Sequence, residues 1–320
     1  MFSRIMATGS YLPDKILTNQ DLEDIVDTTD QWITERTGIK QRHIVADDQS
    51  TCDLAEFAAR NALEAADIEP QSIDLIIVAT TTPDRVFPST ACLLQQRLDI
   101  HGCPAFDVQA VCTGFVYALD IADKYIKTGA AKRALVIGAE TLSRIVDWTD
   151  RTTSVLFADG AGAVIIEASE KPGILSTHIH ADGSFAELLT TNGGITDVGP
   201  DRLDNILIEM KGNEVFKMAV NTLGRIVDET LSANNMQKSD IDWLVPHQAN
   251  IRIINATAKK LKMSTDHVVT TVQNHGNTSA ASVPLALDTA VRDGRIKRGE
   301  TILLEAFGGG FTWGSALIKY

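Results

Sequence analysis

Two kinds of hydrophobic pattern alternate along the chain. Apolar runs of strand length occur at residues 73–79 (IDLIIVA) and 241–247 (IDWLVPH). Each follows a stretch in which apolar residues recur at helical spacing, residues 55–68 and 215–235. Short β-branched runs that alternate with amphipathic helices are typical of parallel sheets covered by helices. The pattern therefore predicts an α/β protein.

The pattern also occurs twice. Residues 108–140 and 272–309 each predict a short strand that ends in small residues, a helix, a glycine turn and an apolar strand. Residues 157–168 and 307–320 each predict a glycine-rich turn followed by a strand. Together with the runs at 73–79 and 241–247, these are three matches that occur in the same order in both halves. They indicate a duplicated unit of about 150 residues, which is too long for a solenoid repeat. We predict halves related by a pseudo-twofold axis, residues 1–172 and 173–320.

The composition narrows the possible functions. The 320 residues carry a formal net charge of −13, which argues against nucleic-acid binding because nucleic-acid-binding proteins present a basic surface. No apolar run reaches the roughly 18 residues of a membrane span, and the first residues lack the apolar core of a signal peptide. Four cysteines without an export signal are expected to be reduced thiols of a cytoplasmic protein. Residues 195–205 are polar and predict an exposed loop.

Cys112 is the first candidate catalytic residue. It lies between an apolar strand and an amphipathic helix, in the segment FDVQAVCTGFVYALD. A thiol at a helix N-terminus is close to unpaired N–H groups and to the positive end of the helix dipole, and both favour the thiolate. Cys112 is therefore expected to be a nucleophile. Cys52, Cys92 and Cys103 lack this context and are expected to be packing residues.

Two further candidates lie in the second half. His247 ends an apolar strand just before a helix. Asn277 lies in the segment QNHGNTSAAS, between a strand predicted at 267–272 (HVVTTV) and a helix. Open α/β sheets place their sites at the carboxyl ends of strands. The duplication is therefore expected to bring His247 and Asn277 to the centre of the molecule, next to Cys112.

Other motifs define what the site contains and what it lacks. The glycine-rich turn FGGGFTWG at 307–314 suits an oxyanion hole, because its N–H groups can face a ligand. It lacks the Lys and Ser/Thr of a P-loop, and the chain has no GxGxxG motif. His178, His180 and His275 lack CxxC or HExxH spacing, so we expect no bound metal.

Several segments together resemble the β-ketoacyl-acyl carrier protein synthase III family. They are ATGSYLP at 7–13, DQWITERTGI at 30–39, ADGAGA at 158–163, VPHQAN at 245–250, NHGNTSAAS at 274–282 and EAFGGGFTWG at 305–314. The resemblance covers essentially the whole chain. It implies a thiolase-like fold with duplicated βαβαβαββ halves in five αβαβα layers. It also implies a cytoplasmic homodimer that uses no cofactor.

The resemblance implies a reaction as well. Cys112, His247 and Asn277 correspond to the Cys–His–Asn triad of the family, and the N–H groups of Cys112 and Gly309 to its oxyanion hole. Cys112 would be acylated by a short acyl-CoA, with acetyl-CoA as the favoured primer. Malonyl-acyl carrier protein (malonyl-ACP) would then lose CO₂ and attack the acyl group, and His247 and Asn277 would stabilise the enolate. The product is 3-oxoacyl-ACP, which starts type II fatty acid synthesis.

Substrate contacts are likewise implied by the resemblance. Trp32 and Arg151 would sandwich the adenine of CoA, because both offer flat faces. The rest of the CoA path would be Thr28, Arg36, Asn213, Phe216, Ala249 and Asn250. The acyl pocket would be formed by Leu142, Phe157, Leu189, Phe307 and Phe87, the last reaching across from a second copy of the chain. A phenylalanine at position 87 indicates a short primer.

One basic helix face is predicted to bind the carrier protein, which is acidic. Between residues 242 and 266 the chain has no acidic residue and four basic ones, Arg252, Lys259, Lys260 and Lys262. Helical spacing puts Arg252, Lys259 and Lys262 on one face. This face begins just after the candidate histidine and would flank the tunnel mouth, with Lys217 beside it.

Three alternative functions remain at this point. A paralogue in secondary metabolism would use the same fold and triad on another acceptor. A thiolase or a hydroxymethylglutaryl-CoA synthase is the second, but a thiolase needs another cysteine in its C-terminal half, and residues 173–320 contain none. The third is a non-enzymatic acyl or CoA binding module, which has no use for a nucleophile. An acyltransferase is therefore the favoured interpretation.

Overall fold

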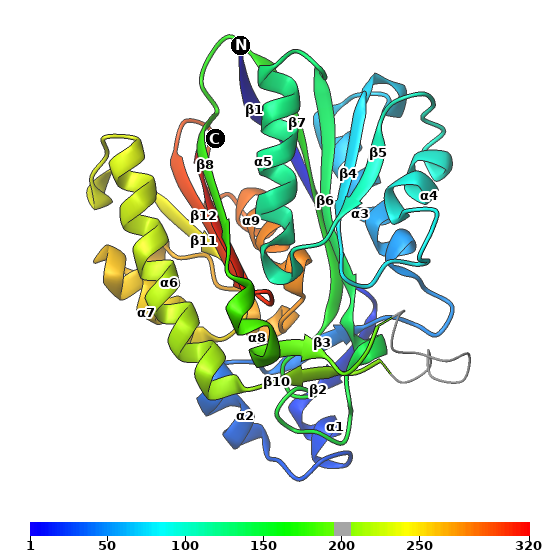
Figure 1. Cartoon of the computed structure of the whole chain (residues 1–320), viewed down its shortest axis with the longest axis vertical. Coiled ribbons are helices and arrows are strands. Elements are labelled where there is room, and N and C mark those ends of the chain that lie inside the picture. Colours follow the sequence, from blue (N-terminus) through cyan, green and yellow to red (C-terminus); the bar gives the residue numbers. More distant parts are fainter. Residues whose placement is uncertain (195–205) are drawn as a thin grey trace.

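Two mixed β-sheets form the framework of the protein in the computed structural model, which describes residues 1–194 and 206–320 (Figure 1). The loop predicted for 195–205 lies outside the described residues. The first sheet, in spatial order, consists of β1 (Phe2–Tyr11), β7 (Asp159–Ser169), β6 (Arg133–Thr141), β4 (Leu75–Ala79) and β5 (Ala105–Val108). The second consists of β8 (Ile174–Ala181), β13 (Thr312–Lys319), β12 (Thr301–Gly308) and β11 (Trp243–Pro246).

The two sheets repeat the same strand order and directions. β1 and β7 pair antiparallel, as do their counterparts β8 and β13. β6 pairs antiparallel with β7, and β12 with β13. β4 and β11 run parallel to β6 and β12. The predicted duplication of an α/β unit is therefore confirmed, while the boundary between residues 172 and 173 stays a prediction.

The strand predicted at residues 267–272 is wrong in extent. Its counterpart β5 pairs with β4 along its whole length, but in the second half only one parallel bridge, between Leu244 and Val268, remains. The 3-10 turn Thr265–His267 and helix α8 (Val272–His275) occupy the residues on either side. The apolar residues at 267–272 do lie at the edge of the second sheet beside β11, but they do not form a full strand there.

The helices form three layers, which with the two sheets make five (Figure 1). Between the sheets lie α5 (Gly114–Lys127) and α9 (Ser282–Arg292), whose apolar residues share one core with both sheets. The outer face of the first sheet is covered by α3 (Thr51–Ala66) and α4 (Thr90–Arg97). The outer face of the second is covered by α6 (Gly212–Ala233) and α7 (Ile251–Leu261). The predicted αβαβα arrangement is confirmed.

Shorter elements gather at one end of the molecule, at the bottom of Figure 1. The two small antiparallel pairs are β2 (Lys15–Thr18) with β3 (Gln41–Ile44), and β9 (Leu189–Thr191) with β10 (Ile208–Met210). The helices between β2 and β3 are α1 (Asn19–Glu23) and α2 (Asp30–Thr37). Within the described ranges, no helix is long and apolar enough to cross a membrane.

Glycines let the start of α9 approach the first sheet. A Cβ added at Gly162, in the ADGAGA segment, would lie 2.6 Å from the backbone N of Leu285. A Cβ at Gly138, its partner on β6, would lie 2.2 Å from the Ala280 carbonyl oxygen. Any side chain at these positions would displace α9. Because Asn277 lies just before the 3-10 turn that leads into this helix, the close packing also holds Asn277 in place.

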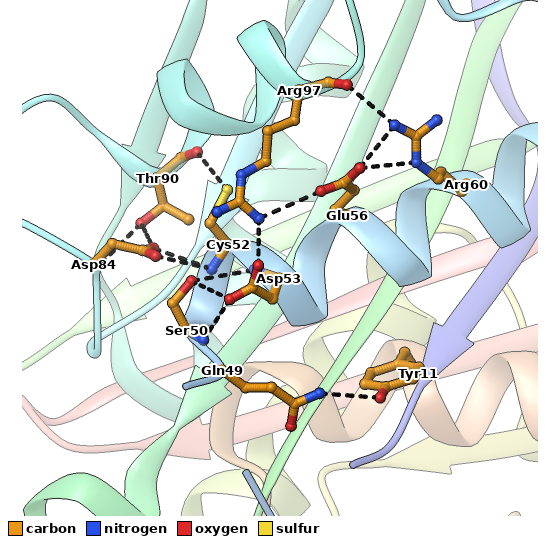
Figure 2. A network of polar contacts seen from close by, with 10 residues as sticks. All are labelled: Tyr11, Gln49, Ser50, Cys52, Asp53, Glu56, Arg60, Asp84, Thr90 and Arg97. Carbon is orange, nitrogen blue, oxygen red and sulfur yellow. Dashed lines mark hydrogen bonds and ion pairs between the residues drawn. The ribbon is translucent and has the colours of Figure 1, made fainter. Parts of the chain in front are cut away.

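A polar network ties the loop between β4 and α4 to the start of α3 (Figure 2). Arg97 of α4 contacts Asp53 in the first turn of α3 at 2.6 Å. Asp84 of the loop accepts a hydrogen bond from the N–H of Cys52 at 3.0 Å, which satisfies a free donor at the helix start. The network therefore anchors the loop that carries Phe87.

Candidate active site

Cys112, His247 and Asn277 line a single cavity of about 420 Å³. Cys112 lies in the 3-10 turn Val111–Thr113, directly before α5. His247 follows the last residue of β11. Asn277 follows the short helix α8, where a strand was expected, and precedes the 3-10 turn Ser279–Ala281 that leads into α9. The duplicated fold thus brings the three side chains to one place.

The Cys112 thiol is buried at a strained turn. Val111 has a φ of +47°, a left-handed conformation that β-branched residues rarely adopt. Gly308 makes room for the turn, because a Cβ there would lie 2.7 Å from the backbone N of Cys112. Burial raises the pKa of the thiol to about 12. Burial thus opposes the thiolate that the start of α5 favours, and the thiolate stays a prediction.

His247 is a neutral imidazole held from two sides. Its backbone N–H donates to the Glu305 carbonyl at 2.8 Å, which extends the pairing of β11 with β12. Its Nδ1 lies 2.5 Å from the Ser282 hydroxyl oxygen. Burial lowers the pKa of His247 to about 3, so the ring carries no charge at neutral pH. Because Nδ1 is engaged, Nε2 is the nitrogen available to a bound substrate.

Asn277 is oriented by its own backbone and by the next turn. Its N–H donates to the Leu156 carbonyl and its carbonyl accepts from the Ala158 N–H, both at 2.9 Å. Its side-chain Oδ1 accepts the N–H of Ser279 at 3.0 Å. With Oδ1 used in this way, the Nδ2 amide is the group left to donate a hydrogen bond into the cavity.

An aromatic and two arginines form one side of the cavity. The guanidinium carbons of Arg36 and Arg151 lie 4.5 and 5.1 Å from the centre of the Trp32 ring. Arg151 also donates to the Asp27 carbonyl at 3.0 Å. Trp32 and Arg151, which the resemblance assigns to the adenine, are therefore neighbours in the structure.

Most of the predicted site residues line this cavity. Besides the central three they are Trp32, Arg36, Arg151, Phe157, Leu189, Asn213, Phe216, Ala249, Asn250, Arg252 and Phe307. Those that do not line it are Thr28, Phe87, Leu142, Gly309, Lys217, Lys259 and Lys260. Leu142 packs behind the wall, in one apolar cluster with Phe157 and Leu189. Phe87 is 82% exposed, and Gly309 is buried beside Gly308, which does line the cavity.

The structure also adds lining residues that the sequence analysis did not assign. They are Thr37, Thr152, Val155, Leu156, Met210, Gly212, Val215, Ala219, Leu223, Ile253 and Gly308. Four of them recur every three or four residues along α6, from Gly212 to Leu223. This spacing was visible in the sequence, but an apolar helix face is equally typical of core packing.

Two buried carboxyl groups lie close to the central residues. Glu140 accepts hydrogen bonds from the hydroxyls of Thr81 and Thr82, both at 2.8 Å, and burial raises its pKa. Glu305 is fully buried, and burial raises its pKa to about 8. Glu305, whose backbone carbonyl accepts the N–H of His247, is therefore mostly uncharged at neutral pH.

The other cysteines differ in exposure. Cys52 is buried and Cys103 is half-buried, as expected for packing residues. Cys92 is exposed on α4, so the expectation of a packing role is wrong there. The apolar residues around Cys92 in the sequence do not reveal this, because the solvent-facing side of a short helix depends on what covers it.

No metal centre is present in the part of the chain that the structure describes, where no three His, Cys, Asp or Glu side chains are grouped to hold an ion. His178 and His180 instead contact Glu229, at 3.3 and 2.9 Å. His275 is half-buried, and burial lowers its pKa to about 4.

Comparisons with known proteins identify the family. Residues 106–183 match the family described as 3-oxoacyl-[acyl-carrier-protein (ACP)] synthase III, and residues 231–320 match its C-terminal part. A β-ketoacyl-[acyl-carrier-protein] synthase III of Thioalkalivibrio sulfidiphilus is 69% identical over 320 residues, which cover 100% of this chain and 99% of the relative. The chain belongs to the β-ketoacyl-ACP synthase III family.

Solved structures agree with this family. The 3-oxoacyl-[acyl-carrier-protein] synthase III of Aquifex aeolicus VF5 has a TM-score of 0.93 at 50% identity, covering 99% of this chain and 100% of that chain. The priming β-ketosynthase of the R1128 polyketide pathway has a TM-score of 0.95 at 34% identity, covering 99% of this chain and 96% of that chain. As a member of the β-ketoacyl-ACP synthase III family, the protein is an acyltransferase with a thiolase-like fold that initiates fatty acid synthesis.

Proposed function

We propose that the protein condenses acetyl-CoA with malonyl-ACP to give 3-oxoacyl-ACP, CoA and CO₂. One observation carries this proposal: a thiol and two oriented hydrogen-bonding groups, on Cys112, His247 and Asn277, line one cavity. A thiol suits acyl transfer, and neutral donors suit the stabilisation of an enolate. Acyl-CoA is a substrate in this reaction, which uses no cofactor.

The first half-reaction acylates Cys112. Its sulfur attacks the thioester carbonyl of acetyl-CoA, the bond from the carbonyl to the CoA sulfur breaks, and the thiol proton ends on CoA. The backbone N–H groups of Cys112 and Gly309 hold the oxyanion of the intermediate. Because burial keeps the pKa of the thiol at about 12, the proton leaves during the attack and not before it.

The second half-reaction forms the carbon–carbon bond. The carboxylate of malonyl-ACP leaves as CO₂, and its electron pair forms an enolate whose oxygen accepts hydrogen bonds from His247 and Asn277. The enolate carbon then attacks the acetyl group on Cys112. The thiolate that leaves takes up one proton, and the acetyl group becomes the end of 3-oxoacyl-ACP.

The mouth of the cavity suits the nucleotide of CoA. We assign the adenine to Trp32 and Arg151, because both offer flat faces and the guanidinium carbon of Arg151 lies 5.1 Å from the centre of the Trp32 ring. The remaining contacts of CoA are assigned to Thr28, Arg36, Asn213, Phe216, Ala249 and Asn250. Asn250 caps α7 and donates to the Arg36 carbonyl at 3.0 Å, so α2 and α7 are joined at this mouth.

The acyl end of the cavity suits a short primer. Phe157, Leu189 and Phe307 line it, Leu142 packs behind them, and we assign its floor to Phe87 of a second copy of the chain. Val86 and Phe87 are 71% and 82% exposed, which favours their coverage by another chain. We therefore propose a homodimer, acting in the cytoplasm, with halves at residues 1–172 and 173–320.

Replacing Phe87 with threonine is expected to let longer acyl-CoA primers react. Removing the ring leaves a cavity that an alkyl chain can fill. Competition between acyl-CoAs of increasing length, with intact-protein mass spectrometry of the acylated enzyme, measures the change. Val86→Thr is the matched control on the same loop and should keep the wild-type profile. An unchanged profile in the Phe87 variant would show that Phe87 is not the pocket floor.

We assign the carrier-protein contact to Lys217, Arg252, Lys259 and Lys260. Arg252 lies over the Phe216 ring at 5.0 Å and lines the cavity, and Lys259 is exposed on α7. The absence of acidic residues between 242 and 266 suggests that these bases are unpaired, but this is wrong for Lys260. Asp228 of α6 lies 2.8 Å from its Nζ. Arg252 is therefore expected to be the strongest contact.

Arg252→Glu is expected to raise KM for malonyl-ACP by about tenfold and to leave acylation by acetyl-CoA nearly unchanged, because acidic carrier proteins are attracted by exposed bases. Added salt should weaken the wild type in the same direction. Steady-state assays of the two half-reactions measure both effects. Lys132→Glu is the matched control, since Lys132 is exposed at the opposite end of β6 from the cavity. Equal damage to both half-reactions would remove α7 from the docking site.

The second candidate is a priming synthase of secondary metabolism. The likeness to the R1128 priming β-ketosynthase favours it, because the fold and chain coverage are as close as for the fatty acid enzymes. Mass spectrometry of the protein after mixing with a panel of acyl-CoAs tests both candidates. Preferred acylation of Cys112 by acetyl-CoA supports the first, and preference for a longer or branched primer supports the second.

A further inference from the structure

The role of His247 depends on which ring nitrogen carries its proton. A neutral imidazole has one N–H donor and one acceptor nitrogen. With the proton on Nε2, His247 donates to an enolate oxygen. With the proton on Nδ1, the lone pair on Nε2 makes His247 a base for the Cys112 thiol. The inference below rests on the proposed function and deepens it.

Ser282 is the partner of the other nitrogen. Its hydroxyl oxygen lies 2.5 Å from Nδ1 of His247 and also accepts the backbone N–H of Gln248 at 3.3 Å. Ser282 is 2% exposed and is the first residue of α9. Among the described residues, no other acceptor lies within hydrogen-bond distance of this hydroxyl. The hydroxyl proton of Ser282 can therefore be donated only to Nδ1 of His247.

Counting hydrogens separates the two arrangements. If Ser282 donates to Nδ1, the hydroxyl proton, the lone pair on Nδ1 and the N–H of Gln248 are all paired. If Nδ1 carries the proton, both Nδ1 and Gln248 donate to the same oxygen, and the buried hydroxyl proton has no acceptor. An unpaired buried polar group is costly enough to shift such an equilibrium by about tenfold or more. The proton therefore belongs on Nε2.

Gln248 keeps this geometry rigid. Its Nε2 donates to the carbonyls of Pro246 and Val269, at 2.8 and 3.0 Å. Its Oε1 accepts the N–H groups of Thr271 and Val272, at 2.8 and 3.1 Å. Every hydrogen-bonding position of the buried amide is used, so the backbone next to His247 cannot turn away from Ser282.

We propose that Ser282 is a positioning residue that fixes the proton of His247 on Nε2, so that His247 is a donor to the substrate and not a base for Cys112. Asn277 is held in an equivalent way, because the Ser279 N–H occupies Oδ1 and leaves Nδ2 to donate. One short segment, residues 279–282, thus orients both donors of the cavity. Its contact with Gly138 of the first sheet, and that of the following residues Pro284 and Leu285 with Gly162, keep the segment in place.

The state of the ring can be measured directly in the unmodified protein. The chain is produced with ¹⁵N-labelled histidine, and the spectrum of His247→Ala identifies the signals of His247 among the seven histidines. We expect a proton on Nε2 and an unprotonated Nδ1. A proton on Nδ1 would overturn the proposal. This result does not depend on activity, so it is independent of whether acetyl-CoA and malonyl-ACP are the substrates.

Ser282→Ala tests the role of the hydroxyl. We expect a mixture of the two His247 tautomers and about a tenfold loss of malonyl-ACP decarboxylation, with acylation of Cys112 unchanged. Ser282→Thr keeps the hydroxyl and is expected to restore the single tautomer and the rate. Thr289→Ala is the control on the same helix, where the hydroxyl serves only the Leu285 carbonyl. A Ser282→Ala protein that keeps one tautomer, or loses both half-reactions equally, would overturn the proposal.

Discussion

Cys112→Ala is expected to form no acetyl-enzyme with acetyl-CoA and to lose condensation by more than about a thousandfold, because the thiol that carries the acyl group is removed. Among the residues that line the cavity, Cys112 is the one cysteine. It lies where the strained turn at Val111 meets the start of α5. Intact-protein mass spectrometry after mixing with acetyl-CoA measures the first effect. Release of product from malonyl-ACP measures the second.

Cys92→Ala is the matched control, because Cys92 is the exposed thiol and lies on α4, away from the cavity lining. This variant should be acetylated like the wild type. Full acetylation of the Cys112→Ala protein on another cysteine would contradict the assignment of the nucleophile. Thermal unfolding of both variants checks that the fold is unchanged.

His247→Ala and Asn277→Ala are expected to lose decarboxylation of malonyl-ACP by a factor of about 10²–10³ each, or about 3–4 kcal/mol. Each change removes one hydrogen bond to the enolate oxygen, whose negative charge develops as CO₂ leaves. Acylation of Cys112 should fall far less, because the attack on acetyl-CoA uses the backbone N–H groups for its oxyanion. Release of labelled CO₂ and the acylation rate, measured separately, test the partition.

An exposed residue away from the cavity serves as the control for these substitutions. His101 is on the surface beside Asp99, so His101→Ala should change neither half-reaction. Rapid release of CO₂ by either central variant would contradict its role as a donor. If both central variants also failed to acylate, His247 would act as the base for the thiol, which the Ser282 contact argues against.

The pKa shifts of the central groups explain why the site works with uncharged residues. Burial lowers the pKa of His247 and raises those of Cys112 and Glu305, so all three are neutral near pH 7. His247 and Glu305 change the folding stability with pH in opposite directions. Because burial lowers the pKa of His247 from 6.5 to about 3, the folded protein loses stability as the pH falls below 6.5. Because burial raises the pKa of Glu305 from 4.5 to about 8, the folded protein loses stability as the pH rises from 4.5 toward 8.

Much of the framework could be predicted because it depends on local pattern. Strand and helix periodicity repeat in the two halves, and parallel pairing with covering helices follows from alternation of the two patterns. This was enough to place Cys112, His247 and Asn277 at ends of elements that meet. The same pattern overestimated the strand at 267–272, because pairing at a sheet edge depends on the neighbouring chain and not on the strand's own residues.

The basic face of α7 illustrates a different limit. The sequence between residues 242 and 266 contains no acidic residue. Asp228 belongs to α6, yet it lies 2.8 Å from Nζ of Lys260 because α6 and α7 pack side by side. Lys262 ends α7 in a left-handed conformation and is not part of the helix face. Contacts between residues far apart in the sequence therefore changed the contribution to carrier-protein binding that we expect from each basic residue.

The amino-acid sequence by itself determined the duplicated α/β architecture, the family motifs and the identity of the three central residues, since these are carried by short-range periodicity and by motif letters. Only the tertiary structure decided their chemical states. Burial raises the pKa of the Cys112 thiol against the effect of the α5 start, and the hydroxyl of Ser282 on α9 reaches Nδ1 of His247. Desolvation and hydrogen bonds between distant segments set these states, because both depend on which atoms surround a group after the chain has folded.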